Sequence, residues 1–419
     1  MAISPYRGSH VNQIKQHNLQ LILLILLHDR TISRVHLAKK TNLSNSTISN
    51  LISELIQQGI VSEDTPNDLD TSGGVRPVGR PSTSIHLEFN ARYVIGVHIG
   101  IGVFRIGVVN LVGEVLTNHI EHFAVDDPAP QVLDQMVAAI KTIISASQVE
   151  CSRFLGVGVG ASGLVDFLKG VNIVAPNLNW RDVPIRDYLQ ERLDLRVVVD
   201  NNVRSMAIGE KYFGAGRDVD SLVFVYGRIG VGAGLIFKGE VFRGSTTGAG
   251  EIGHTVMLLE GGEACRCGNS GCLETLVSEP SILREAEKII RSNPEGILAK
   301  LAQQRPDMTP IELVFTAARA DDPEIRALLD KRAYYLGVAT ASLVNLFNPE
   351  MIIFGGIYAQ GQDLLLTPTI RTVHQMAFGG LGKQVRIQAT SFGWKAGVIG
   401  AAALSLMYFF YQQTESLNE

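Results

Sequence analysis

Cysteine is scarce in this sequence: the 419 residues contain four cysteines and two tryptophans. Three of the four cysteines lie within 265–272, which excludes a framework of disulfides spread along the chain. An apolar run long enough to cross a bilayer is also lacking. The runs at 19–27 and 396–411 both fall short of the roughly 20 residues that a spanning helix needs. We therefore expect no membrane partner and a cytoplasmic location, where thiols stay reduced.

The two apolar runs are assigned differently. The run at 19–27 resembles the core of a signal peptide, but an amphipathic stretch precedes it. His28, Asp29 and Arg30 follow it, where a cleavage site would have small residues. The run at 396–411 is predicted to form a buried helix near the end of the sequence.

A strong excess of charge of either sign is absent. The net charge of −4 gives no overall attraction to nucleic acid or to an anionic membrane. With 46% hydrophobic and 19% charged residues, the composition is that of a globular protein. The length predicts two or three domains. The 42 glycines favour an α/β fold with many tight turns.

The first 60 residues depart from this average, with six basic and two acidic side chains. A first helix is predicted from its helically spaced apolar residues, which are Ile14, Leu19, Ile22, Leu23, Leu26 and Leu27. A second helix is predicted over 34–40 with Ser33 as its N-cap. A third begins after its N-cap Ser44, buries Ile48, Leu51, Leu55 and Ile56, and stops at Gly59.

The second and third helices form a candidate helix-turn-helix. Beside the cap Ser44, the exposed face of the third helix carries small polar groups that suit base edges or phosphates: Asn45, Ser46, Thr47, Ser49, Asn50 and Ser53. That face has asparagine and no arginine or lysine. Asparagine pairs with adenine, so we predict an A·T-rich operator. On this stretch alone, a plain three-helix bundle with a solvated face stays an alternative.

A candidate wing follows the third helix. Strands expected at 60–63 and 83–87 flank a segment rich in Gly and Pro that carries Arg76 and Arg80. Such arginines are suited to entering a narrow minor groove or clamping a phosphate. Together with the helix-turn-helix, the wing predicts a DNA-binding domain over residues 1–88.

From Tyr93 the sequence alternates between strands and helices. Glycine-broken apolar segments predict hairpins at 93–116 and 222–244, and a strand running into a turn at 154–166. The stretch 196–216 reads as strand, polar turn and helix. These similar halves predict a fold of two lobes with a ligand cleft between them.

The clustered cysteines predict a metal site. One imidazole and three thiolates make a tetrahedral zinc set with no open position, so the zinc would be structural; the ligands are His254, Cys265, Cys267 and Cys272. Gly268 and Gly271 would let the chain turn back on itself. A chance cluster of buried cysteines is the alternative. Cys151 stands apart and is predicted to lie in the core.

Two carboxylates flank this cluster. A metal that fixes His254 would hold Glu251 and Glu274 at one side of the cleft. A pair of carboxylates beside an imidazole suits a polyhydroxylated ligand, because each sugar hydroxyl needs an acceptor.

The segments "GAGEIGH" and "CRCGNSGCLE" resemble the signature of the ROK family, the repressors, open reading frames and kinases of bacterial sugar metabolism. The resemblance implies a two-lobed, actin-like (ribonuclease-H-like) sugar-kinase fold over residues 90–412, and the N-terminal part is similar to the repressor branch. We place the lobes at 89–203, completed by 395–413, and at 204–394. The resemblance also implies sugar-contacting residues, which are Asn177, Asn201, Asn202, Glu251, His254 and Glu274.

The sequence departs from the kinase members of the family at the positions that take part in phosphoryl transfer. Asn202 stands where the kinases have the aspartate that accepts the proton of the attacking hydroxyl, and an amide is not a general base. His98 replaces an acidic residue in the first phosphate loop, where Ile101 and Val103 also differ. Arg228 replaces a threonine in the second loop. Phosphoryl transfer depends on these groups, so we predict no enzymatic activity.

The sequence thus predicts a sugar-responsive DNA-binding regulator, a repressor of carbohydrate-utilisation genes with a degenerate kinase domain as its sensor. It would bind a palindromic operator as a homodimer or tetramer. One alternative is an active ATP-dependent sugar kinase that carries a DNA-binding arm. Another is a regulator that has lost its effector and binds DNA constitutively.

Overall fold

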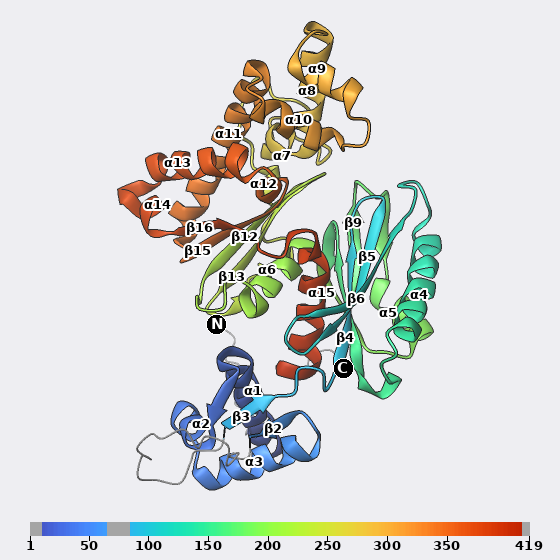
Figure 1. The fold of residues 1–419 in the computed structure, drawn as a ribbon, viewed down its shortest axis with the longest axis vertical. Helices are drawn as coiled ribbons and strands as arrows, with labels where there is room; N and C mark the ends of the chain where they lie inside the picture. The colour runs from blue at the N-terminus through green and yellow to red at the C-terminus, as the bar shows by residue number, and fades with distance from the viewer. Residues whose placement is uncertain (1–10, 65–83, 413–419) are drawn as a thin grey trace, which may run out of the picture.

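The computed structural model describes residues 11–64 and 84–412. A small N-terminal unit lies at one end of the molecule, and the helices α8 (Glu279–Ser292), α9 (Ile297–Gln304) and α10 (Pro310–Arg319) lie at the other end (Figure 1). Two larger sheets lie between these ends. The α/β fold with an N-terminal winged helix-turn-helix agrees with the prediction from sequence.

The N-terminal unit packs helices on a short antiparallel sheet of order β1–β3–β2. Its elements are α1 (Val11–Asp29), β1 (Thr31–Ser33), α2 (Arg34–Thr41), α3 (Asn45–Gln57), β2 (Val61–Glu63) and β3 (Ser84–Leu87). Both predicted N-caps are confirmed. Ser33 Oγ accepts a hydrogen bond from His36 N at 3.3 Å, and Ser44 Oγ accepts one from Thr47 N at 3.1 Å.

The predicted apolar faces of this unit are correct in their centres and wrong at two ends. Ile22, Leu26 and Ile48 are fully buried, whereas Ile14 is 51% exposed and Ile56 is 36% exposed. Ile14 lies in the first turn of α1, before the part of the helix that packs. Ile56 lies in the last turn of α3, at the edge of its apolar face.

The first large sheet has the order β11–β7–β4–β5–β6, with β4, β5 and β6 antiparallel and β7 and β11 parallel to β4. Its strands are β4 (Tyr93–Ile99), β5 (Val103–Asn110), β6 (Val115–His122), β7 (Phe154–Ala161) and β11 (Val197–Asn201). Helices α4 (Ala129–Ala146) and α5 (Ile185–Leu193) pack with it. A side sheet is built from β8 (Leu164–Asp166), β9 (Val171–Ala175) and β10 (Trp180–Val183).

The second large sheet has the order β14–β13–β12–β15–β16. Its strands are β12 (Leu222–Gly227), β13 (Val231–Phe237), β14 (Glu240–Val241), β15 (Met351–Gly356) and β16 (Arg386–Ala389). The further helices of this part are α7 (Leu273–Val277), α11 (Pro323–Phe347), α12 (Ile357–Gln360), α13 (Thr367–Met376) and α14 (Leu381–Gln384). The glycine-broken segments at 93–116 and 222–244 therefore both form the predicted hairpins.

Helices α6 (Asn202–Phe213) and α15 (Ala396–Leu406) pack against each other between the two large sheets (Figure 1). Glycine permits this close packing, because a Cβ on Gly209 of α6 would lie 3.0 Å from Gly400 Cα. It also permits α15 to approach β7, because a Cβ on Gly158 would lie 1.9 Å from Ala401 O. By length and composition the helix over Gly393–Tyr411 is apolar enough to cross a membrane, but 78% of that window is buried inside the protein. It is the buried helix that the sequence predicts.

The N-terminal unit contacts the core through the end of α1. Helix α1 lies against η6 (Met407–Tyr411), and the two belong to one hydrophobic cluster. His28 Nε2 lies 3.2 Å from Asp218 Oδ1, and the Arg30 guanidinium lies 5.3 Å from the centre of the Phe89 ring. The N-terminal unit, called the reading head below, and the last helical turn of the core are thus packed together.

One prediction about the core is wrong. Cys151 is exposed, in the 3₁₀ turn η1 (Cys151–Arg153) that leads into β7. The turn precedes the apolar strand rather than belonging to it, so the cysteine does not share the burial of the strand.

Candidate functional site: a polar cavity between the two sheets

A cavity of about 950 Å³ is lined by residues of both large sheets. It is bounded by the ends of β4 and β5, the side sheet, the N-terminus of α6, the turn between β12 and β13, and the cysteine-rich loop. All six residues predicted to contact sugar line it: Asn177, Asn201, Asn202, Glu251, His254 and Glu274. They come from four separate segments, so the fold brings together groups that the chain keeps apart.

The two glutamates occupy different settings. Glu274 lies in the first turn of α7, and its Oε2 accepts a hydrogen bond from Val231 N at 2.9 Å. Glu251 lines the cavity and is accessible to solvent there. The surrounding cavity wall removes part of its solvation, which raises the pKa of Glu251, while the nearby His254 and Arg204 act in the opposite direction.

The predicted metal ligands converge. The ligand atoms of His254, Cys265, Cys267 and Cys272 all lie within 4.8 Å of one another. Cys265 Sγ is 3.6 Å from His254 Nδ1, and Cys267 Sγ is 3.7 Å from Cys272 Sγ. Thiolates bound tetrahedrally to one zinc at about 2.3 Å would be about 3.8 Å apart, whereas a disulfide requires about 2.05 Å. The spacing fits a zinc ion, and the fit uses Nδ1 of the histidine.

The loop that carries these ligands depends on glycine. Gly268 and Gly271 adopt φ angles of 99° and 71°, and a Cβ on Gly271 would lie 2.0 Å from Leu258 O. The predicted reversal of the chain is therefore present. Burial is the first cause that raises the pKa of the Cys272 thiol to about 12, and the neighbouring cysteines add to it. A divalent cation would reverse this by binding the thiolates.

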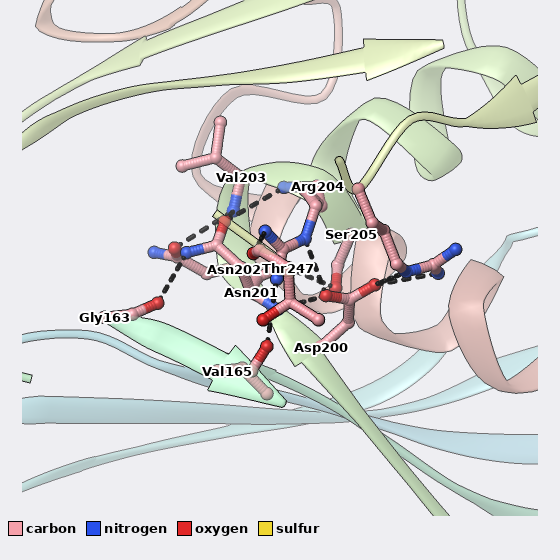
Figure 2. Close-up of polar contacts among 10 residues, drawn as sticks. Gly163, Val165, Asp200, Asn201, Asn202, Val203, Arg204, Ser205 and Thr247 are labelled. Atoms are coloured by element: carbon pink, nitrogen blue, oxygen red, sulfur yellow. Dashed lines mark hydrogen bonds and ion pairs between the residues drawn. The ribbon is translucent and has the colours of Figure 1, made fainter. Parts of the chain in front are cut away.

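The aspartate before α6 is held by two arginines. Asp200 is fully buried, and its Oδ1 accepts a hydrogen bond from Arg204 Nε at 2.7 Å (Figure 2). Its Oδ2 lies 2.9 Å from a terminal nitrogen of Arg243. Arg204 also donates to Thr247 O at 2.7 Å and to Val165 O at 3.3 Å. Asp200 is thus part of a structural ion-pair network that joins segments around the cavity, and it does not face a ligand as a free base.

The two asparagines that follow have distinct roles. Asn201 caps α6: its Oδ1 accepts from Val203 N at 2.8 Å and from Arg204 N at 3.2 Å, and its Nδ2 donates to Gly163 O (Figure 2). Both the oxygen and the nitrogen of the Asn201 side-chain amide are thereby engaged. Asn202 is 8% exposed and lines the cavity; its Nδ2 donates to Ser162 Oγ at 3.2 Å and its Oδ1 accepts from Val203 N at 3.0 Å. Because Asn202 Oδ1 accepts one bond and Asn201 Oδ1 accepts two, Asn202 keeps more hydrogen-bonding capacity for a ligand.

The positions that differ from the kinases line the same cavity. His98 is buried, and Arg105 and Arg228 lie near it on β5 and after β12. The sequence singled out His98 and Arg228 but missed Arg105. The register of the first hairpin places Arg105 directly opposite His98, so pairing that hairpin residue by residue would have found it. Arg204, Arg243 and Arg266, which donates to Asn177 Oδ1, were also missed.

The predicted DNA-reading face is presented to solvent. Ser44, Asn45, Ser46 and Asn50 are exposed, and Thr47 and Ser49 are partly buried. Arg34 holds the helix pair together, because it donates to Ser49 O at 3.3 Å and pairs with Glu63. The predicted wing residues Arg76 and Arg80 lie outside the described residues.

The arrangement has known counterparts. Residues 94–407 match the model of the ROK family, and residues 16–62 match a winged helix-turn-helix DNA-binding model. The chain belongs to the ROK family. It is 30% identical over 397 residues to the xylose repressor of Caldicellulosiruptor bescii, covering 95% of this chain and 97% of that protein.

Solved structures agree with this membership of the ROK family. The crystal structure of a ROK family transcriptional regulator, described as a homologue of the Escherichia coli MLC protein, matches with a TM-score of 0.80 and 26% identity. The match covers 96% of this chain and 99% of that one. A ROK glucokinase from Streptomyces griseus, in complex with glucose and AMPPNP, matches with a TM-score of 0.67 and 30% identity. That match covers 74% of this chain and 98% of the kinase.

Proposed function

We propose that this ROK protein is a sugar-responsive transcriptional regulator, a repressor of carbohydrate-utilisation genes such as those for xylose. The observation that carries the proposal is the pairing of a winged helix-turn-helix with a polar cavity in one chain. The xylose repressor and the solved ROK regulator match almost the whole chain, including the winged helix-turn-helix. The matched glucokinase structure corresponds to 74% of the chain.

The same cavity supports a sensor without catalysis. Asn202 occupies the position of the general base, and an amide does not accept a proton near neutral pH. The adjacent Asp200 is neutralised by Arg204 and Arg243, so it is not a replacement base. The active-kinase alternative therefore lacks a proton acceptor at this position.

The sugar would be held at the end of the cavity near the cysteine-rich loop. Glu251, Glu274 and Asn202 supply acceptors and a donor for hydroxyl groups, and His254 supplies the remaining ring nitrogen. Asn177 and Asn201 would contribute mainly by shaping the wall, since their side chains already bond to Arg266 and to the N-terminus of α6. A structural zinc on His254 and the three cysteines would fix the segment that joins Glu251 to the start of α7, where Glu274 lies.

On the DNA side, Asn45 and Asn50 would read adenine in the major groove, while Ser44, Ser46, Thr47 and Ser49 bind phosphates or base edges. Arg76 and Arg80 would enter a narrow minor groove. A homodimer, or a tetramer built from it, would present two such heads to a palindromic, A·T-rich operator.

We divide the chain into a DNA-binding domain at 1–88, one lobe at 89–203 with 395–413, and a second lobe at 204–394. The division places α15 with the sheet of β4 and β7, against which it packs. The N-terminal domain contacts the first lobe through η6 and the second through His28 and Asp218, so movement of one lobe against the other would shift its position.

A gel-shift titration against the upstream region of the gene, repeated over a panel of sugars, tests this function. We expect a specific complex whose affinity changes about 5–150-fold with one sugar. Asn50→Ala should weaken the specific complex, whereas Gln57→Ala, an exposed change on the last turn of α3, should not. A complex that ignores every sugar would refute the sensor role.

An ATP-consumption assay on the same panel tests the absence of catalysis. We expect no sugar-dependent consumption by the natural protein. Turnover with any hexose would favour the active-kinase alternative.

A further inference from the structure

The end of the cavity formed by β4, β5 and β12 concentrates positive charge. His98 and Arg105 are paired in the antiparallel register of β4 and β5, so their side chains project from the same face of the sheet. Arg228 follows β12 in the turn that leads to β13. All three residues line the cavity.

Arg105 has no counter-ion among the described residues. Within 11–64 and 84–412 its side chain makes no hydrogen bond and no ion pair. Burial is the main cause that lowers the pKa of Arg105, and the positive charge of Arg228 is the next. The positive charges of these two guanidinium groups therefore repel each other. Groups perturbed in this way are concentrated at functional sites.

The acidic groups around this pair do not neutralise it. Arg228 Nε lies 3.5 Å from Glu279 Oε2, and the Arg228 side chain remains 51% exposed. Tyr226 also faces both arginines, but loss of solvation raises the pKa of its hydroxyl, which stays neutral. Glu279 therefore offsets one of the two positive charges and leaves Arg105 unbalanced.

His98 adds an unpaired polar atom to the same place. Its side chain is 5% exposed, and its Nε2 has no hydrogen-bond partner. Burial, followed by Arg105 and Arg228, lowers the pKa of His98 to about 3, so the ring is neutral at pH 7. A neutral imidazole can donate one hydrogen bond. The ring is also fixed in place, because a Cβ on Gly397 would lie 2.5 Å from its Cγ.

The charged end and the proposed sugar end are continuous. Ser162 connects them: its N donates to Ile99 O at 3.1 Å, next to His98, and its Oγ accepts from Asn202 Nδ2 at 3.2 Å. Both ends belong to the one cavity of about 950 Å³, within the size range of sites for small ligands.

We infer that Arg105, Arg228 and His98 bind the phosphate group of a phosphorylated sugar, whose hydroxyls lie toward Glu251 and Glu274. Guanidinium groups bind phosphate oxygens in a bidentate manner, and a neutral imidazole adds one donor. The inference rests on the proposed function, since it names the chemical class of the effector. In this arrangement, His98 and Arg228, which replace phosphate-loop residues of the kinases, bind the phosphate group of the effector and do not transfer it.

Calorimetric titration of the full-length protein tests the inference. The probes are glucose, N-acetylglucosamine and xylose, each compared with its phosphate monoester, together with inorganic phosphate and ATP. We expect at least one monoester to bind ten times more tightly than its parent sugar. Arg105→Gln and Arg228→Gln should each reduce that preference to less than threefold and leave binding of the parent sugar within twofold. Arg228→Gln is the safer variant for folding, because its side chain is half exposed.

Arg181→Gln is the matched control, because Arg181 also lines the cavity but lies exposed on the side sheet. It should keep the preference for the monoester. The inference is overturned if Arg181→Gln loses as much as Arg105→Gln, or if ATP or inorganic phosphate binds as tightly as every monoester. If parent sugars bind as well as monoesters and alter operator binding, the phosphate site fails and the proposed function stands. If no sugar and no monoester binds, both fail.

Discussion

At the scale of single residues, the buried pair of Asp200 and Arg204 has large energetic consequences. The Asp200 side chain is 0% exposed and the Arg204 side chain 1% exposed, and each satisfies the charge of the other. Removing one partner of such a pair leaves an uncompensated charge in the interior. The pair therefore stabilises both the N-terminus of α6 and the adjacent wall of the cavity.

Arg204→Met should lower the free energy of unfolding by about 3 kcal/mol, at the low end of the usual cost of breaking a buried pair, because Arg243 remains beside Asp200. Chemical denaturation monitored by fluorescence measures this loss. Adding Asp200→Asn to the variant should recover part of it, since the buried charge is then removed. A single variant as stable as the natural protein would contradict this account.

Glu210 is a second buried acid, and it lacks a cation partner among the contacts of the described chain. Loss of solvation raises the pKa of Glu210, while hydrogen bonds from Thr390 Oγ1 and Ala215 N act against the shift. The folded state therefore binds a proton more tightly than the unfolded state does. The stability that this proton contributes is complete below the ordinary pKa of glutamate and is lost as the pH rises through the raised pKa.

Glu210→Gln should remove this dependence. Between the ordinary and the raised pKa, the natural protein should lose up to about 1.4 kcal/mol of stability per pH unit relative to the variant. Melting temperatures measured across that pH window for both proteins give the comparison. Parallel curves would show that Glu210 does not bind a proton in this way.

The sequence predicted site residues where the evidence was local. The zinc ligands fall within a short span, so their spacing predicted them, whereas Asn202 was predicted from the resemblance to the ROK family. Arg105 and Arg243 were missed because their partners come from other strands and loops. The register of β4 with β5 brings Arg105 next to His98. The path of the loop after β14 brings Arg243 to Asp200.

At the scale of secondary structure, helix ends marked by caps were the easiest features to predict. Ser33 and Ser44 cap α2 and α3 as expected, and both glycine-rich hairpins form. Strand β1 was not predicted, because its three residues carry no alternation of their own and form a strand only by pairing with β3. Such an element depends on the tertiary structure.

The cap on α3 has a measurable effect. Ser44→Ala removes the acceptor for Thr47 N and should cost about 1 kcal/mol of local stability. Hydrogen–deuterium exchange of peptides from Asn45–Gln57 should become faster. Ser53→Ala is the matched control, because Ser53 is exposed on the same helix and bonds only to Ser49 O. Equal exchange in the two variants would show that the cap contributes little.

At the scale of the whole molecule, the proposed zinc should affect both the stability of the fold and the response to sugar. Chelation should lower the melting temperature and abolish the response to sugar, because the segment between Glu251 and Glu274 is then no longer held by the metal. Sugar-independent DNA binding should persist, since the reading head lies at the other end of the molecule (Figure 1). Metal analysis and gel shifts before and after chelation measure both effects, with zinc-saturated chelator as the control. A full sugar response in metal-free protein would contradict this role.

The contact between α1 and η6 has a consequence for synthesis on the ribosome. The reading head is translated first, but the turn on which it rests, Met407–Tyr411, is translated about 320 residues later. At the usual rates of translation, the nascent head waits roughly 15–60 s for that partner. Throughout this interval the apolar surface of α1 that packs against η6 has no partner there. Chains that end before α15 would therefore leave this surface exposed to water and prone to aggregation.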